Sequence, residues 1–314
     1  MTRMKNITLC MIAVFMFLVF GGCAQRYSIK PPTPSSMLYV EKANTETGLK
    51  ITDQREGDDR NFSIGRLKVY LTNVTDEMIF LRENLVKELN SRGIAVVAYD
   101  TDDAPLQFIV RKYRIRNHRS TGFSPFQTAT TLSGDYISNG ESKKLAFYFR
   151  IGKVPIWSMK EVIDPCYSIP LSLMVKEVAS KINRISFGLQ MPTEKVDALV
   201  KEIEGSTDNY VFLKVLELGY TNNPAAIGPL VRLADHDDDY VKVAAICSLG
   251  VLGAVDQFEF LKDCYNTRTK DEKLMALKSI GDLNTPEAIA FIQSVKNSDE
   301  YNHERIRELV DLFI

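Results

Sequence analysis

The sequence predicts two folded parts. The first is an α+β domain over residues 37–187, with a largely antiparallel sheet and two helices, and the second is an all-α solenoid over residues 190–314. In the first part, strand-like runs come before and after a helical pattern, which is typical of helices that cover one face of a sheet. In the second part, glycines and apolar residues recur every 31 residues, which indicates repeated helix pairs.

The first part contains a helix whose two ends are marked. Thr75 and Asp76 are suited to begin it, apolar residues recur at helical spacing, and Gly93 is suited to a left-handed end. A second helix over 165–185 closes the domain, and a Gly- and Ser-rich turn region is expected before the last strand. Strands are expected at 37–40, 49–51, 67–71, 94–99, 106–115 and 145–151.

The second part is defined by its period. Gly219, Gly250 and Gly281 are 31 residues apart, and each follows an aliphatic residue. Each unit is expected to form two helices, with the glycine at the end of the second, and about four pairs fit between 193 and 314. Other positions that align at this interval are Val196, Ile227, Phe258 and Ile289; Leu199, Leu230, Leu261 and Ile292; Phe212, Val243 and Leu274; and Val215, Ile246 and Leu277.

One unit carries a family resemblance. The run from Tyr240 to Gly250, YVKVAAICSLG, resembles a HEAT repeat, and the neighbouring units do so more loosely. Within it, Ala244 and Ala245 are small enough for close helix packing. The resemblance implies a solenoid that presents an extended surface to other proteins. The fourth pair has charged residues at positions that are apolar elsewhere, which suits a terminal cap facing water.

The N-terminus has the layout of an export signal. Arg3 and Lys5 precede an apolar run over 7–20, too short to cross a bilayer comfortably, and the run stops at Gly21-Gly22-Cys23. Residues 20–23 resemble the lipobox of bacterial lipoproteins, with Phe20 where leucine is usual. The resemblance implies a signal peptide over 1–22 and acyl chains on Cys23. An ordinary secretory signal and an uncleaved anchor are the alternatives.

Residues 23–36 are expected to be a tether. Pro31, Pro32 and Pro34 with Ser35 and Ser36 give residues 24–36 a composition that cannot form a core, and thirteen extended residues could span on the order of 40 Å. Ala24, directly after the cysteine, resembles what outer-membrane lipoproteins carry, since aspartate there commonly signals retention at the inner membrane. We therefore expect a lipid anchor on the periplasmic side of the outer membrane.

Short motifs in the first part carry a second resemblance. They are Asp53-Gln54-Arg55, Ile64-Gly65-Arg66, the helix end at 89–94, and Leu106-Gln107-Phe108-Ile109-Val110. Together they resemble outer-membrane lipoproteins of the YajG type, which implies a location and a fold and no established chemistry. Asp53 and Arg55 are expected to form a structural ion pair.

Charge is distributed unevenly between the two parts. Residues 24–188 hold 24 Lys and Arg against 18 Asp and Glu, whereas residues from 189 onward hold 13 against 22. Lys112, Arg114 and Arg116 alternate along one strand, so they lie on one face of it. This basic row could meet lipid phosphates, an acidic partner or the acidic second part, or it could be a solvated strand end. If the two parts dock, their opposite charges predict a salt-sensitive contact.

Cysteines and clustered acids give no sign of a metal site. Three cysteines would remain after export: Cys166, Cys247 and Cys264. Because the number is odd, at least one thiol has no intramolecular disulfide partner. A disulfide between Cys247 and Cys264 is possible, but a buried free thiol is the usual state of a cysteine in an apolar helix. The acidic run over 235–239 lacks the glycine and distal glutamate of an EF-hand loop. Asp208 and Asp239, 31 residues apart, are instead expected to cap helices.

The functional expectation is a binding protein. Three histidines lie outside any recognisable constellation, and no hydrolase, metalloprotease or nucleotide-binding motif occurs, so we expect no enzyme, catalytic residue, metal or cofactor. Nucleic acid is disfavoured by the export signal. The leading hypothesis is an adaptor or scaffold that binds an envelope protein through the inner helices of the solenoid. The alternative is an envelope-assembly or lipid-handling component that binds an amphiphile in the α+β domain. The oligomeric state is left open.

Overall fold

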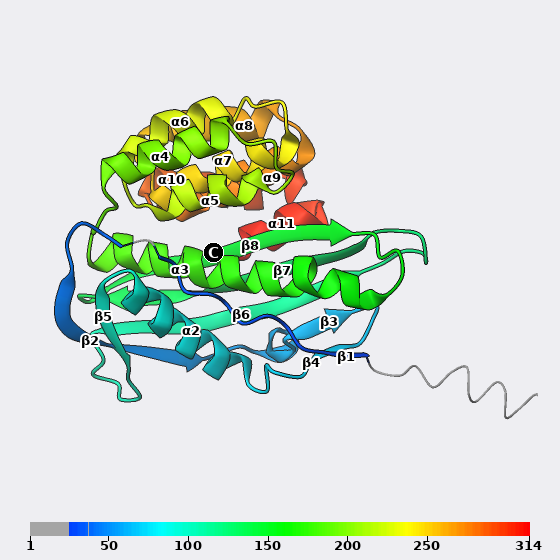
Figure 1. The fold of residues 1–314 in the computed structure, drawn as a ribbon, viewed down its shortest axis with the longest axis horizontal. Coiled ribbons are helices and arrows are strands. Elements are labelled where there is room, and N and C mark those ends of the chain that lie inside the picture. Colours follow the sequence, from blue (N-terminus) through cyan, green and yellow to red (C-terminus); the bar gives the residue numbers. More distant parts are fainter. Residues whose placement is uncertain (1–24, 37) are drawn as a thin grey trace, which may run out of the picture.

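The computed structural model describes residues 25–36 and 38–314. An α+β domain with a mixed sheet is followed by a helical region that lies along one edge of that sheet (Figure 1). The lipid-attachment residue predicted at Cys23, and the signal peptide before it, lie outside the described residues.

The main sheet is mixed, which corrects the prediction of a largely antiparallel one. Its order is β5-β2-β6-β7-β8, and β3 also pairs with β6. The long strands β6, β7 and β8 are antiparallel neighbours, but β2 is parallel to both β5 and β6. The chain passes from β2 to β5 through a helix, and such a crossover permits parallel pairing. The bounds are β2 Ala43–Asp53, β3 Ser63–Gly65, β5 Ile94–Ala98, β6 Leu106–His118, β7 Phe126–Ser138 and β8 Glu141–Lys153.

Strand β7 was not predicted. It occupies the region interpreted as a Gly- and Ser-rich turn, because small polar residues such as Thr128, Thr130 and Ser133 fill more of its buried positions than aliphatic residues do. Each has neighbours on both sides, since β7 lies between β6 and β8. The strand predicted at the start of the domain is also wrong, because residues 38–40 form no strand.

The segment predicted as a tether is built into the domain over its described part. Strand β1 (Gln25–Tyr27) pairs in parallel with β4 (Val69–Leu71). Ile29 is buried, and its N–H donates to Asn73 Oδ1 at 3.0 Å. The N–H of Ser35 donates to a buried Glu88 carboxylate. The proline content alone suggested a free spacer, but Ile29 and these hydrogen bonds fix the segment on the domain.

Both helices predicted in the first part are present. Helix α2 (Glu77–Ser91) begins at Asp76, whose Oδ1 accepts from the N–H groups of Met78 and Ile79 at 2.8 and 2.9 Å. Helix α3 (Ile169–Ser186) follows a short π-helical turn, η3 (Asp164–Ser168). The remaining short turns are η1 (Gly57–Arg60) and η2 (Met159–Val162).

The helical region alternates inner and outer helices. The inner helices α5, α7, α9 and α11 pack on one another in that order, and α4, α6, α8 and α10 pack on their outer side (Figure 1). The bounds are α4 Thr193–Glu204, α5 Val211–Tyr220, α6 Ile227–Leu233, α7 Asp239–Leu252, α8 Phe258–Thr267, α9 Lys270–Leu283, α10 Pro286–Lys296 and α11 Glu304–Val310; the short turns η4 (Pro224–Ala226), η5 (Val255–Gln257) and η6 (Asp299–Asn302) lie between them.

The 31-residue period has a direct physical cause. A Cβ on Gly219 would lie 2.9 Å from the Cβ of Ser248, and one on Gly250 would lie 2.4 Å from the Cα of Ser279. The Oγ of Ser248 donates to the carbonyl of Val215 at 3.0 Å, and Ser279 repeats this bond one unit later, to Ile246 at 2.8 Å. The repeated glycines are therefore the points at which successive inner helices approach most closely.

Candidate functional site

The inner helices face the first domain. Helix α3 contacts α5 and α7, and strand β8 contacts α9. The surface that the sequence suggested for a protein partner is therefore largely covered by the chain's own sheet domain. What remains open between the two parts is the candidate site.

Three residues with left-handed backbone join the two parts at the same 31-residue interval. Asn222, Gly253 and Asn284 have φ of 53°, 70° and 54° and end successive inner helices. Asn222 Oδ1 accepts from the Ser180 hydroxyl of α3 at 3.1 Å. Asn284 accepts from the N–H of Lys144 in β8 at 3.1 Å and donates to its carbonyl at 3.0 Å. The repeat thus presents one docking position per unit to the first domain.

Glycine at the middle of these positions leaves room for an arginine side chain. A Cβ on Gly253 would lie 1.7 Å from a guanidinium nitrogen of Arg184, the α3 side chain that reaches over this turn. The same guanidinium donates to the carbonyl of Asp282 at 2.9 Å. Helix α3 therefore contacts the ends of three successive units.

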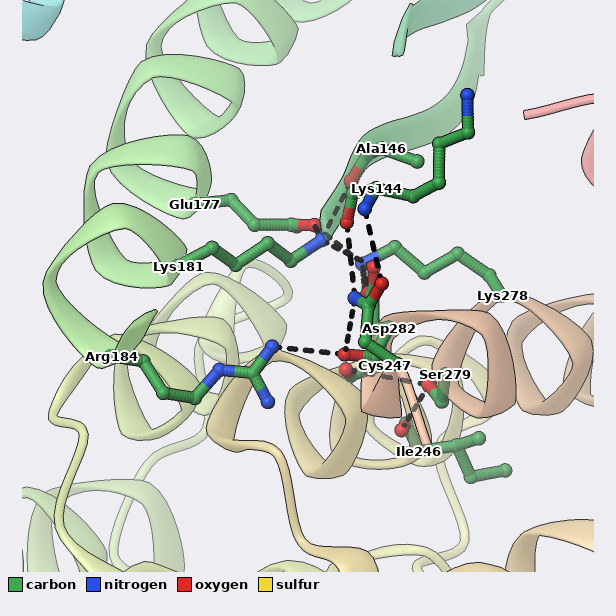
Figure 2. Close-up of polar contacts among 11 residues, drawn as sticks. Lys144, Ala146, Glu177, Lys181, Arg184, Ile246, Cys247, Lys278, Ser279 and Asp282 are labelled. Atoms are coloured by element: carbon green, nitrogen blue, oxygen red, sulfur yellow. Dashed lines mark hydrogen bonds and ion pairs between the residues drawn. The ribbon is translucent and has the colours of Figure 1, made fainter. Parts of the chain in front are cut away.

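A buried cluster of four charges lies at the centre of the interface (Figure 2). Lys181 Nζ lies 2.7 Å from Glu177 and 2.6 Å from Asp282, and it donates to the carbonyl of Ala146 at 2.6 Å. Lys278 Nζ lies 2.5 Å from Glu177 and 2.8 Å from Asp282. The four side chains are at most 2% exposed. Two belong to α3 and two to α9, so each part of the chain supplies one cation and one anion.

The cluster is held ionised by mutual attraction. Burial raises the pKa of Asp282, but attraction to Lys181 and Lys278 outweighs it and leaves the pKa below its ordinary value. Burial disfavours the charged form of Lys278, but Asp282, Cys247 and Glu177 raise its pKa well above the ordinary value. Because charges of both signs balance, the cluster joins the two parts without an uncompensated buried charge.

A second buried cation joins more distant segments. Arg92, at the end of α2, pairs with Glu88 at 2.7 Å, and the Tyr39 hydroxyl lies 3.0 Å from it. The guanidinium also donates to the carbonyls of Lys176 in α3 and Tyr220 in α5. The side chain is fully buried, so it connects α2, α3 and the first helix pair at one point.

The predicted basic row contacts the acidic second part. Arg116 lies 2.9 Å from Glu308 and 2.6 Å from Glu304. Arg114 lies 3.9 Å from Glu308 and also 3.0 Å from Asp59 of the first part. The Glu308 side chain is buried, whereas the other side chains in these ion pairs are half-buried or exposed. Lys112 lies on the same face of β6 and has no ion pair within the described part of the chain. Salt screens the exposed pairs but not the buried cluster, so we expect a weaker salt dependence of docking than the charge asymmetry alone predicts.

The remaining sequence expectations have simple outcomes. Asp53 and Arg55 form an ion pair at 2.8 Å, as predicted. The three cysteines are buried free thiols, and burial raises the pKa of Cys247 to about 11 and that of Cys166 to about 12.

The residue predicted to cap the helix after the acidic run, Asp239, is wrong by one position, because Asp238 is the cap. The side chain of Asp238, not Asp239, accepts from the N–H groups of Tyr240 and Val241 at the start of α7. Asp239 is the first residue of the helix and pairs with Lys242. Asp208 accepts from the N–H of Tyr210, as a cap would.

A cleft opens between β8 and the inner helices. Its volume is about 400 Å³. Tyr220 and Tyr148 line it, are nearly fully buried, and have hydroxyls with no hydrogen-bond partner within the described residues. The rim includes Tyr240, which is 64% exposed. The apolar lining comprises Phe147, Phe149 and Ile151 of β8, Phe212 and Leu216 of α5, Val243 of α7, and Leu274 and Met275 of α9.

Strand β8 presents a free backbone edge to this cleft. It is the last strand of the sheet, so only β7 pairs with it. Both amide groups of Lys144 point away from β7, since they bond to Asn284, and the carbonyl of Ala146 bonds to Lys181. Amide groups alternate in direction along an antiparallel strand, so those of Tyr148, Arg150 and Gly152 point the same way. They have no hydrogen-bond partner among the described residues.

Comparisons with known proteins leave the identity open. Neither the family models nor the curated proteins compared with this chain include a match. One solved structure, described as the crystal structure of an uncharacterized protein, is similar over 52% of this chain and 95% of its own, with 12% identity and a TM-score of 0.27. At that TM-score the similarity supports no inference. The resemblances to YajG-type lipoproteins and to HEAT repeats stay predictions.

No helix among residues 25–36 and 38–314 is both long enough and apolar enough to cross a membrane.

Proposed function

We propose that this chain is a non-catalytic, membrane-anchored binding protein of the bacterial envelope, and that its cleft accepts an extended apolar segment of a protein partner along the free edge of β8. One observation supports this most strongly: three successive outward amide positions of an edge strand lie in a cleft lined by apolar side chains together with charged ones such as Asp271, Glu272 and Arg305. An extended peptide that adds to such an edge gains main-chain hydrogen bonds, and pockets for its side chains give specificity.

The cleft supplies both kinds of interaction. Outward groups of Tyr148, Arg150 and Gly152 would pair with the backbone of the partner segment. Side chains of that segment on one face would contact the apolar walls supplied by α5, α7 and α9.

This proposal revises where the adaptor hypothesis places binding. The helix pairs are proposed to be a short HEAT-like solenoid, but their inner helices serve as one wall of the cleft because α3 and β8 cover the rest. Anchoring is proposed to come from acylation of Cys23 after export to the periplasm, on the outer membrane, and it is supported by the charge and apolar pattern of residues 3–23.

A second candidate ligand is an amphiphile. The volume and the apolar lining of the cleft suit an acyl chain as well as a peptide. Mass spectrometry of organic extracts from the purified protein would distinguish the two: a lipid at near one per chain favours the amphiphile, and its absence leaves the peptide.

Photo-crosslinking in cells tests the proposed function. A photoreactive phenylalanine analogue replaces Tyr240 at the rim of the cleft, where an aromatic side chain is already present and exposed. The matched control carries the same group at Ile289 on the outer helix α10, which is also exposed. We expect a protein adduct from position 240 and none from 289. Adducts from 289 alone would place the partner on the outer helices and would reject the cleft.

A further inference from the structure

Three large apolar side chains are exposed to solvent at one end of the sheet. Phe123 is 95% exposed, Ile156 is 76% exposed and Trp157 is 90% exposed. Phe123 lies in the connection from β6 to β7, and the other two lie just after β8. Because Phe126 pairs with Lys153, both connections are at the same end of the strands (Figure 1).

The backbone holds these side chains in place. The Glu161 carboxylate accepts the N–H groups of Ile156, Trp157 and Ser158, each at 2.9 Å, and these bonds lower the pKa of Glu161. In the other loop, Arg119 donates to the carbonyls of Ser124 and Gly122 and contacts the sulfur of Met159. The apolar side chains therefore project from two loops that are bonded internally and to each other.

The first described residue, Gln25, lies at the same end. Gln25 pairs with Val69 at the beginning of β4, and Arg66, three residues earlier, donates to the carbonyls of Arg119 and Ser120. Figure 1 shows β1 beginning beside the end of the sheet that bears these loops. Cys23 precedes Gln25 by two residues, which span at most about 7 Å.

The charge of the loops suits an anionic surface. Residues 119–125 and 153–161 contain Arg119, Lys153 and Lys160 and one acidic residue, Glu161, whose carboxylate accepts three backbone N–H groups of its own loop. Tryptophan and other aromatic residues flanked by Lys and Arg are characteristic of the boundary between lipid headgroups and acyl chains.

We propose that this end of the domain rests on the membrane and inserts Phe123, Ile156 and Trp157 into its interfacial layer. The proposal rests on the anchor proposed at Cys23, which leaves only about 7 Å between the acylated residue and the folded domain. It assigns the lipid bilayer, rather than a protein, as the occupant of this surface. It also puts Gly152, which lines the cleft, near the membrane, because Gly152 directly precedes the loop that bears Ile156 and Trp157.

Fluorescence tests the proposal, because Trp157 is the only tryptophan in the chain. The purified lipidated protein is reconstituted into vesicles of phosphatidylethanolamine and phosphatidylglycerol. We expect its emission to shift to shorter wavelength and to be quenched by lipids brominated near the headgroup. Emission that stays typical of indole in water, with no quenching by brominated lipid, overturns the proposal. A shift that occurs only when envelope protein extract is added also overturns it, because it assigns the surface to a protein.

Variants and an unacylated chain separate this surface from the anchor. A chain with Cys23→Ser is mixed with the same vesicles, and we expect weak, salt-sensitive binding that Phe123→Asp or Ile156→Asp lowers about tenfold. Ile289→Asp is the matched control and should leave binding unchanged. Mass spectrometry reports acylation of Cys23 independently. If the native protein is not acylated but still shows the Trp157 shift, the membrane-contacting surface is supported and the lipid anchor is rejected. If the protein is acylated but shows no shift, only the membrane-contacting surface is rejected.

Discussion

Replacing Lys278 with methionine is expected to lower the free energy of unfolding by about 3–5 kcal/mol. Among the described residues, the substitution leaves Glu177 and Asp282 with Lys181 as the one cation at ion-pair distance, in a site where each side chain is at most 2% exposed. An uncompensated buried charge is costly because neither water nor a counterion reaches it. Urea denaturation followed by circular dichroism measures the loss.

Two further variants make this test specific. Arg305→Met removes a pair with Asp271 that is largely exposed, and it should cost no more than about 1 kcal/mol. The double variant Lys278→Met with Asp282→Leu removes one charge of each sign and should recover much of the loss, since replacing a complete buried pair is often neutral. A Lys278→Met cost equal to that of Arg305→Met would mean that the two parts do not dock through this cluster.

The contribution of the cluster should depend on pH in a defined direction. The pKa of Asp282 is lowered in the folded protein, so its contribution is present above its ordinary value of 3.8 and is lost as pH falls through the folded value. The pKa of Lys278 is raised, so its contribution is present below its ordinary value of 10.5 and is lost only at higher pH. The stability difference between the native chain and Lys278→Met should therefore be flat near neutral pH and shrink in acid below pH 3.8.

The second large effect is expected at a repeated glycine. Gly250→Ala places a Cβ 2.4 Å from the Cα of Ser279 and 2.8 Å from its carbonyl oxygen, so the backbones of α7 and α9 must move apart. Overpacking of this kind typically costs about 1–3 kcal/mol. Thermal unfolding of the variant beside the native protein measures the cost.

Gly228→Ala is the control for this prediction. A Cβ on Gly228, in the outer helix α6, would meet nothing within 4 Å. Alanine there should be neutral or stabilising by about 0.5–1 kcal/mol, because it restricts the unfolded chain and favours the helix. Equal destabilisation by the two substitutions would contradict the view that the 31-residue period reflects close helix contact.

The sequence allowed prediction where local chemistry and spacing were sufficient. Asp76 and its following apolar residues predicted α2, and the glycines at 31-residue intervals predicted the alternating helices. One of the contacts predicted for the basic row was the acidic second part of the chain, and Arg116 does contact Glu304 and Glu308 there. These features depend on local rules for helix caps, closely packed glycines and ion pairs, which the residue types and their spacing reveal.

Other features depended on contacts that no local pattern records. Strand β7 is rich in threonine and serine, and it forms a strand because β6 and β8 pair with its backbone on both sides, which the sequence of β7 alone does not reveal. The proline-rich segment is fixed by Ile29 and by Glu88, more than fifty residues away from Ser35. The cleft arises where β8 meets helices that begin more than fifty residues later, so neither segment predicts it alone.

The most direct test of the proposed binding mode changes one N–H group at the free edge of β8. Gly152→Pro removes an amide hydrogen that points away from β7, which an edge strand tolerates, and Gly152→Ala retains it. The measurement is the yield of the protein adduct formed from position 240 in cells. We expect Gly152→Pro to reduce the yield several-fold and Gly152→Ala to leave it unchanged. Equal yields from the two variants would contradict strand addition as the way this protein holds its partner.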